Sequence, residues 1–558
     1  MLPVSLPRSI TCLLDRFRGC FTTHTFATFY GLACGFWAQP GLHTVCGMLV
    51  GAQLQQAWHH ARAHRFFSHA RWSADQLGLV LLDLICALLV ADGAPVRLVA
   101  DDTLMRRSGR KVFGAPCHHD PLAPGRHRIA WANNWVVVGV LVDLPFVPHR
   151  AVCLPILARL WQPRHTPGRL DLACELVRLV CAHLGDRRVD LVCDGADAGR
   201  ALQGLPAQAT VCCRLRADAR LHRLPPPRRP GTRGRPRTKG DRLPDLTRLA
   251  GRVTTPFALH QVTRYGHNGL AAIACFACLW PAVFGTRPVQ VVLVRPPDAP
   301  DGFDLALVCT DLAATPVELV ERYAARWQVE VCFREIRQDA GVGQARNRTR
   351  RAVERTVPFG LVCYSLAIVW YAQHGHHPAD LAARRALAPW YQTKATPSAA
   401  DMLAKLRRVL IATQYRQGHA PEPTLPEILQ VQAALGCHWS LKCESPVMIV
   451  HSLLVDFSGG DTDATYRPGR RGAETGPAMR TGYGQPAVAV RDARCVVGRA
   501  ADCAGAAGRA RRCQGAGGLA WSSVRQSPAH RHTDPQLATD PLGARGRGCA
   551  ARRRHHVP

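Results

Sequence analysis

One short stretch, residues 323–337, combines a single carboxylate with side chains that bind phosphate. Tyr323, Arg326, Glu330 and Arg337 follow one another at intervals of three, four and seven residues. At about 100° per residue on an α-helix, these side chains fall on one narrow stripe. The other acids of the stretch project to the opposite side. Such a stripe is also common on a solvated helix surface, so its meaning depends on the rest of the chain.

Two β-rich segments supply further acids. The segment 96–103 contains Asp101 and Asp102, and the apolar segment 189–194 ends in Asp194. Because strand side chains alternate between faces, Asp102 shares a face with the apolar positions of its strand. We therefore expect Asp102 to be the first acid of a site that also contains Asp194 and Glu330, with Asp101 as the alternative. Each aspartate alone is also typical of a turn after a strand.

The order of the surrounding elements indicates how these acids meet. Strands are predicted at 134–144 and 152–157, and a helix at 169–184, between the two acid-bearing strands. Three strands, a helix and a fourth strand form the order of the RNase H-like fold, in which the first and fourth strands are neighbours. Asp102 and Asp194 would then lie side by side, which is costly without a cation and natural around Mg²⁺. We expect an α/β fold with this mixed sheet.

The chain is long enough for several domains around this sheet. More than a hundred residues separate Asp194 from Glu330, so an inserted domain is expected between them. The predicted segments are a helical N-terminal DNA-binding domain (1–92), the first half of the RNase H-like core (93–205), a mainly β insertion that opens with a strand at 209–216 (206–300), the second half of the core (301–375), C-terminal helices (376–438) and a disordered tail (439–558).

The net charge of the chain indicates the kind of molecule that it binds. The net charge is +31, arginine carries nearly all of it, and such a field in a soluble protein most often binds nucleic acid. The Pro-, Gly- and Arg-rich loop 223–242 cannot pack and is predicted to be mobile. Its residues Arg233, Arg235 and Arg237 resemble a hook for a narrow minor groove, although binding to any phosphate backbone remains open.

The sequence also indicates the cellular compartment in which the protein is expected. The longest apolar stretch, 77–91, is interrupted by Asp83 and is too short to cross a bilayer, so no membrane is expected. No signal-peptide pattern opens the chain, and the protein is expected in the cytoplasm. The 23 cysteines are scattered singly, which favours buried free thiols.

Taken together, these residues resemble the DDE transposases of bacterial insertion sequences, in the group marked by a Tyr-x2-Arg-x3-Glu-x6-Lys signature. Arg337 stands in the Lys position, and the resemblance extends from about residue 10 to about 435. It implies that Asp102, Asp194 and Glu330 hold two Mg²⁺ ions, or Mn²⁺ in their place. The resemblance also implies an enzyme that cuts double-stranded DNA at the transposon ends and joins the freed 3′ ends to target DNA.

The same resemblance assigns roles to the remaining signature residues. Tyr323, Arg326 and Arg337 would grip the phosphates beside the cut. The protein would act as a dimer on DNA, at the bacterial nucleoid. Two other functions remain open: an RNase H-like nuclease without strand transfer, and a catalytically decayed transposase that acts only as a DNA-binding protein.

Overall fold

A computed structural model describes residues 6–109, 111–120, 128–228, 234–251, 256–299 and 301–415. In chain order the elements are α1 (Arg8–Asp15), α2 (Thr23–Ala38), α3 (Val45–Gly51), α4 (His60–Ser68), α5 (Ala74–Leu89), β1 (Val96–Arg106), β2 (Cys117–His119), β3 (Ile129–Leu144), β4 (Val147–Trp161), α6 (Arg169–Leu184), β5 (Val189–Cys193), β6 (Ala209–Arg214), α7 (Leu246–Ala250), β7 (Ala258–Arg264), β8 (His267–Leu279), α8 (Pro281–Phe284), β9 (Pro288–Arg295), β10 (Leu305–Cys309), α9 (Pro316–Ala324), α10 (Gln328–Gln338), α11 (Arg350–Trp370), α12 (Ala379–Leu387) and α13 (Ala399–Tyr415).

Five strands form the core of the sheet, in the order β4-β3-β1-β5-β6. The pairs β3–β4 and β1–β3 are antiparallel, whereas β5 runs parallel to β1 and β6 parallel to β5. Helix α6 connects β4 to β5, so strand order and connection together make the predicted RNase H-like α/β fold. Because β1 and β5 are parallel, Asp101 within β1 and Asp194 directly after β5 lie toward the same end of the strand pair.

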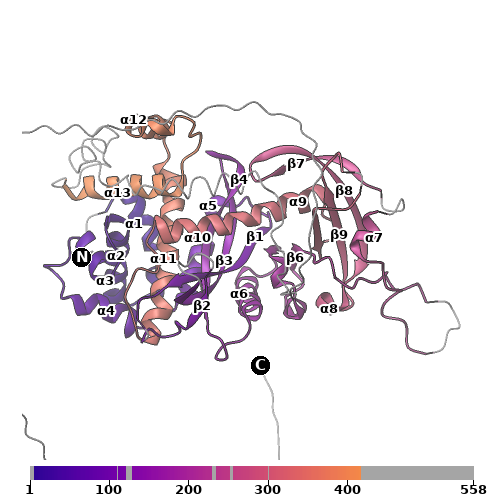
Figure 1. Cartoon of the computed structure of the whole chain (residues 1–558). Coiled ribbons are helices and arrows are strands. Elements are labelled where there is room, and N and C mark those ends of the chain that lie inside the picture. Colours follow the sequence, from indigo (N-terminus) through magenta and orange to yellow (C-terminus); the bar gives the residue numbers. More distant parts are fainter. Residues whose placement is uncertain are drawn as a thin grey trace, which may run out of the picture. The chain divides into compact units, whose positions relative to one another are not determined.

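Strands β10, β9, β8 and β7 continue this sheet beyond β6, all in antiparallel pairs (Figure 1). We expected the strand that begins at Ala209 to open the insertion, but β6 pairs with β5 as the fifth strand of the core. Strand β10 lies between β6 and β9. The inserted strands therefore extend the core sheet itself.

The N-terminal helices begin at side-chain caps, which the sequence pattern partly reveals. Thr22, Thr44 and Ser73 each accept a hydrogen bond from a backbone N–H in the first turn of α2, α3 and α5. Helix α2 is buried on nearly all sides, so it shows no one-sided apolar stripe that periodicity could detect. The indole of Trp37 donates to the carbonyl of Cys363 at 2.8 Å, which fastens α2 to α11.

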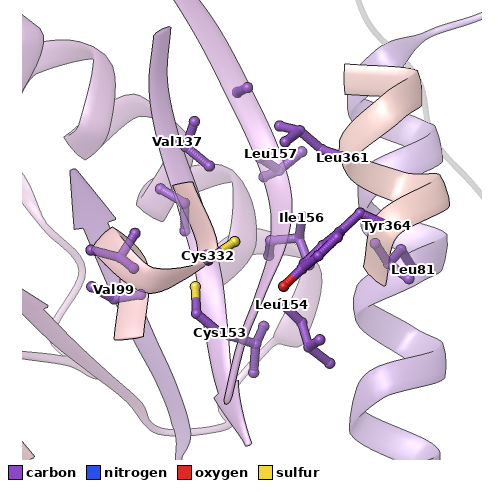
Figure 2. Packing of buried hydrophobic residues seen from close by; sticks show 14 of the residues in the cluster. Leu81, Val99, Val137, Cys153, Leu154, Ile156, Leu157, Cys332, Leu361 and Tyr364 are labelled. Atoms are coloured by element: carbon purple, nitrogen blue, oxygen red, sulfur yellow. The ribbon is translucent and has the colours of Figure 1, made fainter. Parts of the chain in front are cut away.

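Helix α11 is the central helix of the hydrophobic core. With the turn that follows it, the segment Arg350–Gly375 is long and apolar enough to cross a membrane, but 89% of its most apolar window is buried inside the protein. Figure 2 shows Leu361 and Tyr364 of α11 directed at β4, and the hydroxyl of Ser365 donates to the carbonyl of Pro155 in that strand. Its apolar character therefore follows from burial between the sheet and the N-terminal helices.

The same packing holds α10 against the sheet. Val329, Cys332, Phe333 and Ile336 form its buried face, and α10 contacts β1 and β4. Cys332 lies beside Cys153 of β4 in Figure 2, and both are free thiols, as are all the cysteines in the described ranges. This face fixes the rotation of α10 and hence the direction of its polar side chains.

Helices α9 and α10 follow one another across the sheet (Figure 1). Thr315 and Glu318 form a capping box at the start of α9, with Pro316 in its first turn. α9 contacts β5 to β10, while α10 contacts β1 and β4. The single helix that we expected is interrupted by a 3₁₀ turn at Ala325–Trp327, which lies where the two halves of the sheet meet.

Helices α12 and α13 are the last described elements. Residues 416–438 and the expected tail lie outside the described residues.

The hydroxyl of Tyr364 donates to Glu335 of α10 at 2.6 Å, and burial raises the pKa of Glu335. Replacing Tyr364 with Phe removes this donor from a buried carboxyl, which keeps only its backbone hydrogen bond with Ala399 and its charge contacts, so we expect a loss of about 1–3 kcal/mol in the free energy of unfolding, measured with urea. The double variant Tyr364→Phe/Glu335→Leu should recover part of the loss, because no buried carboxyl remains. Equal stability of wild type and Tyr364→Phe would contradict this account.

Candidate active site

Asp101 lies within β1, and Asp194 directly follows the adjacent strand β5, in the middle of the sheet. Val99 of β1 is paired with Val192 of β5, and each acid stands two residues beyond its valine. Side chains at matching positions of neighbouring strands point to the same face, so Asp101 and Asp194 share one. The carboxylate of Asp194 also accepts a hydrogen bond from the backbone N–H of Gly195 at 2.7 Å, which fixes its direction.

The α9–α10 segment brings the signature residues onto that same face. The hydroxyl of Tyr323 donates to Asp194 at 3.4 Å. From the 3₁₀ turn, Arg326 reaches Glu330 at 2.8 Å and Asp101 at 3.4 Å. One guanidinium therefore bridges a carboxylate of the sheet and a carboxylate of the helix.

Burial and charge act against each other in this cluster. Burial lowers the pKa of Arg326, but the carboxylates of Glu330, Asp194 and Asp101 raise it more, so the guanidinium stays charged. Burial raises the pKa of Glu330, and the contact with Arg326 offsets only part of that rise. Burial also raises the pKa of the Tyr323 hydroxyl, which therefore remains a hydrogen-bond donor at neutral pH.

Asp102, our expected first acid, points to the opposite face of β1. Its carboxylate accepts two hydrogen bonds from Arg169, at 2.9 and 3.0 Å, and one from the amide of Asn134 at 2.9 Å. Arg169 is the first residue of α6, and Asn134 belongs to β3. The structure thus brings Asp101, and not Asp102, together with Asp194 and Glu330.

Arg337 lies farther along the same face, beside β1. Its guanidinium donates to the hydroxyl of Thr103, two residues beyond Asp101 on the same side of the strand. Burial lowers the pKa of Arg337. The helical stripe predicted from the sequence therefore follows the direction of β1, with Arg326 at the acids and Arg337 beyond them.

A buried ion cluster that sequence reasoning did not detect holds α9 in place. Arg322 lies 3.4 Å from Asp190 of β5 and 3.7 Å from Asp311 after β10. Arg188 pairs with both acids from the other side, and Thr210 donates to Asp190 at 2.7 Å. Because Arg322 directly precedes Tyr323, this cluster sets where the site helix crosses the sheet. The pattern Arg-x-Asp before a buried strand was its only sequence signal.

The basic loop 223–242 joins the folded part of the chain at a different place from the acids. His222 bridges to Arg242 and to Leu279 at the end of β8, whereas Asp101 lies within β1 and Asp194 follows β5. Arg235 and Arg237 are exposed, and Arg237 lies 3.3 Å from Asp241. Arg233 is outside the described residues.

Three carboxylates from two strands and a helix are suitable donors for Mg²⁺, which prefers oxygen ligands. In the described conformation, however, Arg326 contacts two of them. Within the described ranges, no three His, Cys, Asp or Glu side chains are grouped so that they could hold a metal ion. The three carboxylates are the right type of ligand for a divalent ion. In this conformation, however, two of them bind the guanidinium of Arg326.

The comparisons with known proteins agree with this geometry. Residues 16–268 match the family described as DDE superfamily endonuclease, a range that contains Asp101, Asp102 and Asp194 and ends before Glu330. No curated protein matches the chain. Over residues 16–268, which are fewer than half of the chain, the protein is similar to the DDE superfamily endonucleases, in agreement with the RNase H-like sheet and with Asp101 and Asp194 on adjacent parts of it.

Proposed function

We propose that the chain is a transposase that binds the ends of a bacterial insertion sequence, cleaves them and joins the 3′ ends to target DNA. The observation that carries the proposal is the meeting of Asp101, Asp194 and Glu330 on one face, with Arg326 between two of them. The endonuclease family match supports the cleavage step. The protein would act in the bacterial cytoplasm, at the nucleoid, as a dimer on double-stranded DNA.

In this proposal the catalytic acids are Asp101, Asp194 and Glu330, with Asp101 in place of Asp102. These three carboxylates would hold two Mg²⁺ ions, or Mn²⁺ in their place. Bound there, such ions supply an activated water and stabilise the attacking and leaving oxygens of a phosphoryl transfer. Asp102 instead ties the start of α6 to β1 through Arg169.

Tyr323, Arg326 and Arg337 would orient the DNA strand. A guanidinium offers a planar fork of donors that matches phosphate oxygens, and a neutral tyrosine donates one further hydrogen bond. Because Arg326 and Arg337 are spread along β1, they would contact successive positions of the backbone and hold the strand in line for attack. Arg233, Arg235 and Arg237 of the basic loop would bind phosphates away from the cut.

The experiment that tests the function uses the flanking DNA of the element with Mg²⁺ and compares the intact chain with Glu330→Ala. We expect cleavage at the ends followed by joined products for the intact chain, and DNA binding without cleavage for the variant. Cleavage without joined products would indicate a nuclease. Binding without cleavage by either protein would indicate a decayed copy that acts only as a DNA-binding protein.

Asp101 and Asp102 form a matched pair on opposite faces of one strand. Asp101→Asn should reduce cleavage at least about a thousandfold, because a metal ion supplies several kcal/mol of transition-state stabilisation. Asp102→Asn should retain cleavage and lose no more than about 1 kcal/mol of stability, since its ion pair with half-exposed Arg169 is partly solvated. Cleavage rates of the two variants decide between the acids, and the reverse result would restore Asp102 as the first acid.

The basic loop makes a separate prediction about binding. Replacing Arg233, Arg235 and Arg237 with Gln should weaken binding to duplex DNA and reduce the slope of log affinity against log salt by roughly 0.9 for each phosphate that the loop no longer neutralises. The matched control is Arg216→Gln, an exposed arginine paired with Asp218 outside the loop. An unchanged slope in the loop variant would show that the loop points away from DNA.

A further inference from the structure

We infer that Arg326 is an exchangeable counter-ion of the site, which competes with the divalent metal for Asp101 and Glu330 until a DNA phosphate withdraws it. This inference rests on the proposed function and adds to it a regulation of the same residues. It concerns what Arg326 does before DNA is bound.

The carboxylates of the site need a positive charge beside them. Asp101 and Asp194 stand at matching positions of adjacent parallel strands, and Glu330 faces them from α10. Carboxylates gathered in this way repel one another unless a cation is present. Arg326, whose side chain is only 12% exposed, supplies that cation through its contacts with Glu330 and Asp101.

Arg326 and a metal ion require the same oxygens. Arg326 binds Glu330 through Oε1 and Asp101 through Oδ2, which are oxygens that a metal ion would need. A divalent ion and a guanidinium on the same carboxylates would also repel each other. Metal binding must therefore weaken or break the contacts of Arg326.

A DNA phosphate is the alternative partner of Arg326. This residue lies in the 3₁₀ turn between α9 and α10, with its guanidinium 5.8 Å from the centre of the Tyr323 ring. A phosphate placed beside Tyr323 offers the guanidinium a bidentate, charge-assisted contact in exchange for two carboxylates. DNA would thus free the acids for metal, and by linkage metal would strengthen DNA binding by the same factor. Without DNA the site would stay closed by its own arginine.

The test measures metal binding, not activity. The full chain is titrated with Mn²⁺, whose free concentration is followed by its EPR signal, with and without a short duplex of arbitrary sequence. Without DNA, Arg326→Gln should bind Mn²⁺ at least about tenfold more tightly than wild type, because a charge-assisted contact no longer has to be broken. With the duplex, the affinity of wild type should rise and that of Arg326→Gln should change little.

Arg337→Gln is the matched control, since it removes another partly buried arginine of the same helical segment that donates to Thr103 and not to the acids. Without DNA, its Mn²⁺ affinity should equal that of wild type. If Arg326→Gln does not fold, Arg326→Lys replaces it, because a single ammonium cannot bridge both acids as a fork does and should give a smaller gain.

Two results would count against the exchange, and they differ in what they say about the proposed function. Equal Mn²⁺ affinity in wild type and the Arg326 variant, together with loss of binding in Asp101→Asn, would overturn the exchange and leave the metal site intact. Absence of Mn²⁺ binding in every variant, with and without DNA, would overturn both.

Discussion

The repulsion between two carboxylates, Asp101 within β1 and Asp194 directly after the adjacent parallel strand β5, is the constraint on which the candidate site depends. Asp101 and Asp194 are placed together by backbone register alone, so every other part of the site must tolerate or neutralise them. Arg326 does so from a 3₁₀ turn between two helices. The position of this 3₁₀ turn over β1 and β5 depends on the contacts that hold α9 and α10 against the rest of the protein.

Two different interactions hold those helices. Helix α10 is held by apolar packing, since Cys332 and its neighbours face β4 and the core that α11 completes. Helix α9 is held by charge, through Arg322 and the buried acids Asp190 and Asp311. The inserted strands supply the surface under α9, because they extend the core sheet instead of forming a separate one. The insertion is therefore part of what positions the site.

The large positive charge does not all face DNA. Arg322 and Arg188 neutralise buried acids, and Arg107 donates to the carbonyls of Gly343 and Ala345 in the segment after α10. Burial lowers the pKa of Arg107 to about 10, so it stays charged near neutral pH. Arginine here also stabilises the interior of the protein, and a count of charges overstates the surface available for phosphate.

From the sequence alone, local periodicity indicated strands within β1, β3, β4 and β5, helix α6 and the helical stripe from Tyr323 to Arg337, because each depends on neighbours within a few residues. Which aspartate joins the site was decided only by tertiary structure. A parallel strand buried on both faces is apolar on both, so apolar neighbours could not distinguish Asp101 from Asp102, whereas pairing with β5 does. Tertiary structure also decided that β6 belongs to the core sheet and that Arg326 bridges two acids, because both depend on strand partners and helices far apart in the chain.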